Sequence, residues 1–129
     1  PSMRGLQFSG IPIELSPHRI YNCSAIACDS IYAFNEIMFL LLGGCGVGIS
    51  VQRHHIDELP ELVGPQKRKR RYLIGDSIEG WADAVWCLIN SYCLDCYYSI
   101  QYDHELVFDS SQIIFKGTPL TSGGYAPRY

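Results

Sequence analysis

A cysteine with polar neighbours is the first candidate for chemistry in this sequence. Cys23 stands in the motif YNCS, between Asn22 and Ser24, whose side chains form hydrogen bonds rather than hydrocarbon contacts. A reactive cysteine needs polar surroundings that allow a thiolate to form and a reagent to reach it. A lone cysteine is more often a packing residue, so the motif leaves two interpretations open, a reactive thiol and a packing thiol.

A glycine-rich turn is the second candidate. Four glycines and a cysteine interrupt a hydrocarbon run in FLLLGGCGVGISV, residues 39–51. Backbone without Cβ atoms can approach a sugar or a phosphate closely, and its N–H groups can point at the ligand. The stretch matches neither G-x-G-x-x-G nor a P-loop, because no lysine follows the glycines and the predicted helix precedes them. It therefore predicts either a ligand contact or a tight helix-to-strand turn.

Two further motifs offer other chemistry. Cys93 and Cys96 have the C-x-x-C spacing of a redox pair or half a zinc site, and Cys87 and His104 could complete a set of four ligands. The pair falls at the end of a predicted helix, whereas thioredoxin-like chemistry needs it at the start, so we expect no metal site. The basic run Lys67–Arg71 could contact phosphate or direct localisation, but a solvated loop is the commoner case.

The elements that must position these residues alternate between strand and helix. The predicted order is an extended segment at 3–8, a turn at 16–20, a strand at 21–27, a helix from 29, a strand at 46–52 buried on both faces, a loop at 53–75, a helix from 76, and one or two strands within 95–117. Asp29 and Ser30 offer N-cap chemistry for the first helix, and Asp76 and Glu79 have the spacing of a capping box for the second. This order predicts an α/β parallel sheet or part of a barrel.

Composition limits the class of protein. The 129 residues, 47% of them apolar, suit a single segment with a packed core, and the net charge of −3 gives no general attraction for nucleic acid. The N-terminal sequence lacks the apolar region of a signal peptide, and the apolar stretch at 37–51 is shorter than the roughly 20 residues that span a bilayer. Six cysteines without a secretory signal favour reduced thiols and a cytoplasmic location.

Five motifs, in order, resemble the catalytic subunit of ribonucleotide reductase, in particular its adenosylcobalamin-dependent (class II) type. They are PSMRGLQFSG, YNCSAIACDSIYAFNEIMFLLLGGCGVGISVQR, DELPEL, GDSIEGWADAV and FDSSQIIFKGTPLTSGGYAP. The resemblance covers essentially the whole chain. It implies the family's ten-stranded α/β barrel, built from two five-stranded parallel halves, of which residues 1–129 would form the N-terminal part.

The resemblance also implies a reaction, the replacement of the ribose 2′-hydroxyl of a ribonucleoside di- or triphosphate by hydrogen. In the family, adenosylcobalamin cleavage generates a radical that passes to a cysteine, and the thiyl radical removes the 3′-hydrogen. Two other cysteines supply the reducing equivalents and become a disulfide. The implied partners are the ribonucleotide substrate, a deoxynucleotide effector, a thioredoxin-like reductant and the remaining part of the barrel, in the same or a separate chain. Neither nucleic acid nor a membrane is expected.

The matching motifs assign roles to individual residues. Cys23 matches one member of the reducing pair and is the implied catalytic residue. The positions that match the lining of the substrate site are Ser2, Asn22, Cys23 and Gly46. The positions that match the effector segment at a helix N-terminus are Asp29, Ser30 and Ile31. An aspartate there suits a ribose hydroxyl better than a phosphate. No residue is implied as a metal ligand.

The sequence departs from the family pattern in two ways. IIFKG lacks the arginine and proline that usually precede the lysine and glycine, and GGYAPRY diverges from the expected continuation. The radical cysteine, its neighbouring asparagine and glutamate, the second reducing cysteine and the cobalamin-contacting surface have no counterpart here. Alone, residues 1–129 are therefore expected to be inactive. The alternative functions are a reductase-derived nucleotide-binding or interaction module without catalysis, and a small metal-binding protein.

Overall fold

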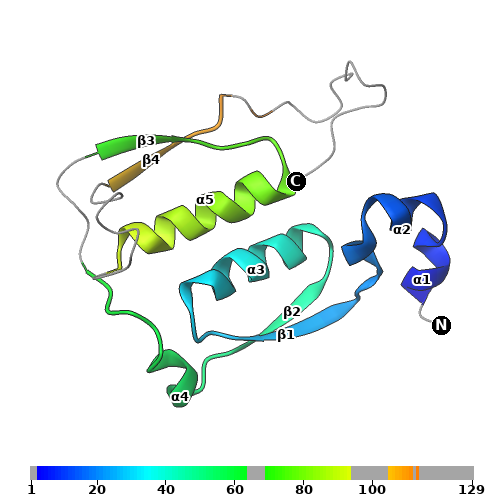
Figure 1. Cartoon of the computed structure of the whole chain (residues 1–129), viewed down its shortest axis with the longest axis horizontal. Coiled ribbons are helices and arrows are strands. Elements are labelled where there is room, and N and C mark those ends of the chain that lie inside the picture. The colour runs from blue at the N-terminus through cyan, green and yellow to red at the C-terminus, as the bar shows by residue number, and fades with distance from the viewer. Residues whose placement is uncertain (1–2, 64–68, 94–104, 112, 114–129) are drawn as a thin grey trace. The chain divides into compact units, whose positions relative to one another are not determined.

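The computed structural model describes residues 3–63, 69–93, 105–111 and 113, which belong to two compact units, Pro1–Pro60 and Glu61–Tyr129. Each unit is built around one pair of parallel strands and one longer helix (Figure 1). In the described part of the chain, no helix has the length and apolar character needed to cross a bilayer.

The first unit contains a strand–helix–strand arrangement preceded by short helices. Its elements are helix α1 (Met3–Phe8), helix α2 (Ile11–Leu15), the 3₁₀ helix η1 (Pro17–Ile20), strand β1 (Cys23–Ala27), helix α3 (Ile31–Leu42), strand β2 (Gly46–Ser50) and helix α4 (Arg53–Ile56). β1 and β2 pair in parallel, from Cys23 opposite Gly46 to Ala27 opposite Ser50. α3 connects the two strands and contacts both (Figure 1).

The second unit repeats the strand–helix–strand order. Its elements are strand β3 (Lys69–Leu73), helix α5 (Ile78–Ser91) and strand β4 (Glu105–Asp109). β3 and β4 pair in parallel, from Lys69 opposite Glu105 to Leu73 opposite Asp109, and α5 contacts β4. Ile78, Ala82 and Cys87 on α5 are buried, as is Ile74 directly after β3.

The parallel strands and the two longer helices confirm the predicted α/β class. α3 begins at Ile31 with Ser30 at its N-cap, although the Ser30 side chain makes no capping hydrogen bond. Its apolar residues recur at helical spacing, and it ends with Gly43 at the C-cap, followed by Gly44 with a φ of 86°. β4 lies within the region predicted to hold one or two strands. The described strands form two separate pairs, so the ten-stranded barrel remains a prediction.

Four of the predicted elements are wrong or incomplete. Met3–Phe8 is helical rather than extended, because Met, Arg, Leu and Gln are good helix formers and the segment lacks strand alternation. Residues 53–75 contain α4 and β3 rather than a continuous loop. The basic segment of β3 forms a strand because it pairs with β4. The N-cap of α5 is Ser77, not Asp76. β2 is not buried on both faces, because Gly46, Gly48 and Ile49 are exposed.

Candidate functional site

The register of β1 and β2 brings three of the predicted substrate-site residues together. Cys23 opens β1, Gly46 opens β2, and the two are direct partners in the parallel pair. The Gly46 N–H donates to the Asn22 carbonyl oxygen over 2.8 Å, and all three residues are exposed. Cys23 lies at a strand end, as predicted, and the structure shows that this is the amino end. The fourth predicted residue, Ser2, lies outside the described residues.

Cys23 differs from the other described cysteines in its exposure. Cys23 is exposed and in no disulfide, whereas the other described cysteines are buried; these are Cys28, Cys45, Cys87 and Cys93. Cys45 directly precedes Gly46 but is only 4% exposed, and its thiol donates to the Gly46 carbonyl oxygen over 3.5 Å. Cys23 is therefore the described thiol that a reagent in solution can reach most readily.

Gly43 and Gly44, the first two glycines of the turn, are required by the fold. Gly44 has a φ of 86°, a left-handed conformation that side chains with a Cβ rarely adopt. A Cβ on Gly43 would lie 2.8 Å from Cδ2 of His18, which is too close for both atoms to keep their places. Packing and backbone conformation therefore account for this half of the glycine motif.

Gly46 and Gly48, the second two glycines, are not required by the fold. A Cβ on Gly46 would lie 3.7 Å from the Asn22 carbonyl oxygen, and one on Gly48 would lie 3.7 Å from that of Ser24, both ordinary contact distances. Both glycines are exposed and neither has a positive φ. The fold therefore requires neither glycine. Gly46 is the direct partner of Cys23, so the ligand interpretation of the motif applies to Gly46.

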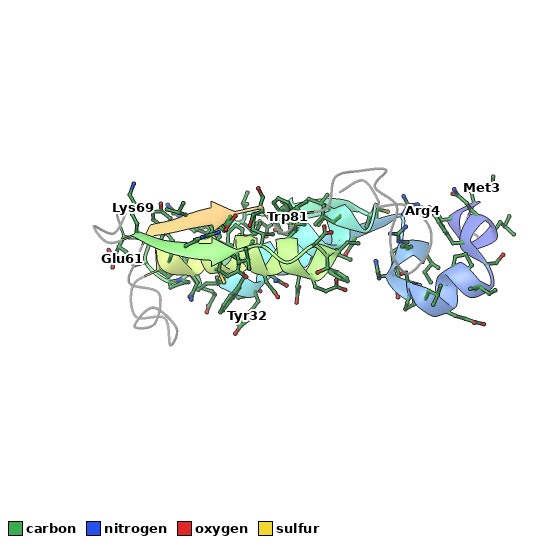
Figure 2. The ribbon with its side chains drawn as sticks, turned by 90° about the horizontal axis from the view of Figure 1, so that it is seen from above. Met3, Arg4, Tyr32, Glu61, Lys69 and Trp81 are labelled. Carbon is green, nitrogen blue, oxygen red and sulfur yellow. The ribbon has the colours of Figure 1, made fainter. Side chains whose placement is uncertain are left out.

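Arg4 is a residue of this site that the sequence did not reveal. Its Nη1 donates to the carbonyl oxygens of Arg19 (3.4 Å) and Tyr21 (3.2 Å), and its Nη2 donates to that of Gly44 (2.6 Å). Figure 2 shows Arg4 on the side of α1 toward the strands, whereas Met3, which is 80% exposed, lies on the far side. Arg4 and Gly44 are 40 positions apart, so no local pattern could predict their contact.

His18 supports the same turn from η1. Its ring packs against Phe39 of α3, with the ring centroids 4.9 Å apart, and it lies against Gly43. Its Nε2 is buried and has no hydrogen-bond partner. No sequence pattern indicates this role, because a histidine in a short turn belongs to no periodic arrangement of residues.

The predicted effector segment lies at the opposite end of β1. Asp29 is exposed and follows the carboxyl end of the strand, and Ser30 and Ile31 begin α3. Cys23 and Asp29 are six positions apart, which in an extended chain corresponds to about 20 Å. The two predicted sites are therefore separate, and β1 is the shortest connection between them.

A serine and a histidine lie at the same end as the effector segment. The Cys28 N–H donates to the Ser50 carbonyl oxygen over 2.9 Å, and the Ser50 hydroxyl lies 3.1 Å from Nδ1 of His55. The rings of His54 and His55 have centroids 3.9 Å apart. The sequence had suggested no role for either histidine, and the structure places them on α4 beside the carboxyl end of β2.

The basic run and the C-x-x-C motif give no further site in the described residues. Lys69–Arg71 belong to β3, where Arg71 pairs with Asp109 of β4. The Ser111 N–H, which donates to the Asp109 carboxylate over 2.9 Å, and then the Arg71 guanidinium hold the pKa of Asp109 below its usual value. Among the described residues, no three potential metal ligands lie together. Cys96 and His104 lie outside them, so the metal-binding alternative stays untested.

An open pocket in the second unit has a different character from the Cys23 site. It has a volume of about 340 Å³ and lies between α5 and the ends of β3 and β4. Trp81, Leu88 and Phe108 form part of its wall, and Ser110 is the one polar residue among the described residues that line it. The described part of its lining offers hydrocarbon contact and includes no acid, base or thiol.

The chain thus combines a mixed α/β fold of parallel strand pairs with an exposed thiol beside bare glycine backbone. No protein-family model matches the sequence, and no curated protein matches it either. A solved structure does: the crystal structure of a B-12 dependent (class II) ribonucleotide reductase is similar, with a TM-score of 0.73 and 20% sequence identity. The match covers 98% of this chain and 24% of the reductase chain.

This structural similarity agrees with the resemblance found in the motifs. The chain spans about a quarter of the reductase chain to which it is similar and has the fold of that part. At 20% identity the similarity establishes the fold, not the reaction.

Proposed function

We propose that residues 1–129 are the N-terminal part of a ribonucleotide reductase barrel of the adenosylcobalamin-dependent type. In this proposal the chain supplies one reducing cysteine, Cys23, and parts of the substrate and effector sites. The supporting observation is the strand register, which sets the exposed Cys23 thiol opposite Gly46 and beside Asn22, in a fold similar to a class II reductase. The remaining part of the barrel would complete the active site.

The proposed role of Cys23 is to deliver reducing equivalents. Cys23 and a second thiol from the remaining part of the barrel would together lose two hydrogen atoms and form a disulfide. The 2′-hydroxyl would leave as water, and a hydrogen atom would take its place on the ribose. A thioredoxin-like dithiol would then re-reduce the disulfide by thiol–disulfide exchange, which requires an accessible sulfur such as that of Cys23. This cycle suits a compartment that keeps thiols reduced, such as the cytoplasm.

The neighbours of Cys23 would bind the substrate. Gly46 leaves the backbone uncovered beside the thiol, so a ribose or a phosphate can approach more closely than any Cβ would allow. The Asn22 side chain can donate and accept hydrogen bonds to ribose hydroxyls. Ser2 joins this group on the strength of the sequence motif alone.

The described residues do not form a site for adenosylcobalamin. The exposed strand face beside Cys23 consists of small side chains and backbone, namely Ala25, Gly46 and Gly48. The buried Nε2 of His18 is enclosed against α3 rather than turned to solvent. In the proposal the cofactor, which supplies the radical, is therefore held by the remaining part of the barrel.

The proposed effector site is the segment Asp29–Ile31. The Asp29 carboxylate is exposed at the start of α3, where it can accept a hydrogen bond from the 3′-hydroxyl of a deoxynucleotide. Because β1 connects this segment to Cys23, a shift of the strand along its axis would move residues at both sites. Effector binding would act on the substrate site through that element.

The Cys23→Ser variant tests the proposal in the native polypeptide, together with any chain that completes its barrel. A hydroxyl cannot take part in disulfide formation, so turnover with a dithiol reductant should fall by about three orders of magnitude. Nucleotide binding should change by no more than about twofold, because the serine keeps the shape of the site. The matched control is Cys45→Ala, which removes a buried thiol next to Gly46 and should retain turnover.

Two outcomes would contradict the proposal. Full turnover by Cys23→Ser would remove Cys23 from the reaction. Tight nucleotide binding by the wild-type polypeptide without any nucleotide reduction would favour the alternative, a reductase-derived binding module without catalysis.

A further inference from the structure

Arg4 joins three backbone segments that are far apart in the sequence. The carbonyl oxygens of Arg19, Tyr21 and Gly44 all accept hydrogen bonds from its guanidinium. Tyr21 directly precedes Asn22, and Gly44 lies two positions before Gly46. The acceptors therefore belong to the two chain segments that lead into the candidate site.

These contacts lie where the strand pairing stops. The hydrogen bond from the Gly46 N–H to the Asn22 carbonyl oxygen closes the amino end of the β1–β2 pair. Beyond it the two backbones are no longer paired as strands, and the side chain of Arg4 spans the space between them. A guanidinium suits this task because its N–H groups form a rigid planar fork that can reach several acceptors at fixed angles.

The contact with Gly44 also bears on the conformation of the glycine turn. Gly44 has a φ of 86°, and its carbonyl oxygen accepts the shortest of the three bonds from Arg4, at 2.6 Å. The position of a Cβ on Gly44 would lie 3.3 Å from Nη2 of Arg4. Arg4 thus packs directly against the turn that it bonds.

We propose that Arg4 is a positioning residue for the Cys23–Gly46 site. By bonding Tyr21 and Gly44 it holds the entry to β1 and the entry to β2 at a fixed separation, so that Asn22 and Cys23 stay in place against Gly46. Arg4 acts through the backbone and touches no reacting atom. This inference rests on the proposed function in one respect, the assignment of the Cys23–Gly46 site to the ribonucleotide.

The first test measures thiol reactivity in the native polypeptide and does not depend on activity. Cys45 directly follows Gly44 and is 4% exposed, so it reports on whether the turn stays closed. In Arg4→Ala, iodoacetamide should alkylate Cys45 about tenfold faster, because local opening of the turn no longer breaks bonds to Arg4. Peptide mass mapping resolves each cysteine. Cys87, buried in the other unit, should react at its wild-type rate.

Two further variants sharpen this measurement. Arg4→Lys keeps the positive charge but presents a single ammonium, which cannot span the acceptors, so the Cys45 rate should lie between those of wild type and Arg4→Ala. Arg71→Ala removes one guanidinium from the other unit and should leave the Cys45 rate unchanged. An unchanged Cys45 rate in Arg4→Ala would overturn the proposal. So would equal acceleration of Cys45 and Cys87, which would indicate general unfolding.

The second test is kinetic and uses the same variants in the active assembly. Arg4→Ala should lower kcat for nucleotide reduction by about tenfold or more, and free guanidinium at millimolar concentration should restore part of the loss. If Cys45 of Arg4→Ala is alkylated faster but kcat stays at the wild-type value, Arg4 holds the turn without affecting the reaction. That result would overturn the positioning role. If wild type itself reduces no nucleotide, the proposed function fails, and the Cys45 rates still decide whether Arg4 holds the site.

Discussion

The glycines of the helix-to-strand turn differ in what the chain needs from them. Gly43 and Gly44 are held by His18 and Arg4, and the positive φ of Gly44 excludes most other residues. Gly46, on β2, meets nothing closer than 3.7 Å at its Cβ position, so the fold would accept an alanine there. This contrast makes the glycines separable by mutation.

Gly46→Ala should weaken substrate binding without weakening the fold. The new methyl group would lie at ordinary contact distance from the Asn22 carbonyl oxygen, so the free energy of unfolding should change by no more than about 0.5 kcal/mol. The same methyl group would occupy space beside Cys23 that we assign to the ribose, and KM for the ribonucleotide should rise by about tenfold. Steady-state kinetics of the native polypeptide and urea unfolding measure the two effects.

Gly48→Ala is the matched control, because it adds the same methyl group two positions further along the same strand, opposite Ala25. Its KM should stay within about twofold of the wild-type value. A KM unchanged in Gly46→Ala would remove Gly46 from the substrate site.

Gly44→Ala should have the opposite profile, a loss of stability. An alanine at a φ of 86° costs about 1–2 kcal/mol, and its Cβ would press on Nη2 of Arg4. Urea unfolding of Gly44→Ala beside Gly48→Ala measures the difference. Equal stability of the two variants would show that the turn relaxes to a different conformation and that the strain is not local.

The candidate site was partly readable from the sequence. Asn22, Cys23 and Gly46 were identified through their motifs, and the structure brings them together because a parallel pair aligns the starts of its strands. Arg4 and His18 were not identified, since their contacts with Gly44 and Gly43 join residues that no local pattern relates. Contacts between residues far apart in the sequence can be identified only from the folded structure.

At the scale of elements, α5 shows how a helix can be predicted while its start is misplaced. Asp76 and Ser77 are both good N-cap residues, and only one of them can take the position. The Ser77 N–H donates to the Gly75 carbonyl oxygen over 2.9 Å, and this turn aims the Ser77 hydroxyl at the Gly80 N–H, 2.9 Å away. A Cβ on Gly80 would clash with the Gly75 carbonyl oxygen, so the glycine is part of the same turn.

Ser77→Ala should therefore destabilise the second unit by about 1 kcal/mol through loss of the cap of α5. Ser77→Gly is the matched variant, because glycine is itself an acceptable N-cap and should cost only a few tenths of a kcal/mol. Urea unfolding followed by circular dichroism compares the two. A larger loss for glycine than for alanine would show that the hydroxyl is not the source of the stability.

β3 was missed for a reason that belongs to tertiary structure. The segment Lys69–Leu73 is basic and reads as a solvated loop, yet it pairs along its whole length with β4, more than 30 positions later. Arg71 then meets Asp109 across the pair. The composition of a segment does not show which strand it pairs with, and that pairing decides whether the segment forms a strand.

Asp109 should make the stability of this strand pair depend on pH. The Ser111 N–H and then Arg71 lower the pKa of Asp109 from its usual 3.8, so the folded state favours the carboxylate. The resulting stability is fully present above the unfolded pKa and is lost as the pH falls through the lower folded pKa. The free energy of unfolding of wild type relative to Asp109→Asn should therefore be constant from about pH 7 to 5 and decrease below it.

A second variant separates the two causes of this shift. In Arg71→Ala the dependence on Asp109 should be reduced but not abolished, because the hydrogen bond from the Ser111 N–H is the larger cause. Urea unfolding between about pH 7 and 2 measures both variants. A difference between wild type and Asp109→Asn that stays constant across the acid range would contradict the assignment.

At the scale of the whole molecule, the described strands leave much of their surface without a partner. β1 and β2 pair only with each other, so each has an outer edge with no strand beside it in the described residues. Large apolar side chains are exposed in the same unit; they include Met3 (80%), Leu6 (62%), Ile11 (69%), Leu15 (78%) and Val51 (67%). Open parallel edges and exposed apolar groups are unusual in a finished domain, because such edges invite further pairing. They are what a segment of a larger sheet would show.

The proposed barrel therefore predicts different behaviour for the segment and for the assembly. Residues 1–129 expressed alone should self-associate, elute above their 14.5 kDa in size-exclusion chromatography and bind a hydrophobic dye. In the native polypeptide, with any chain that completes it, hydrogen exchange should show the amides of β1 and β2 protected on both edges, and dye binding should disappear. A segment that is monomeric, binds no dye and unfolds cooperatively would instead be a domain complete in itself. Since the proposed reaction takes its second thiol from the remaining part of the barrel, that result would favour the nucleotide-binding module over the reductase.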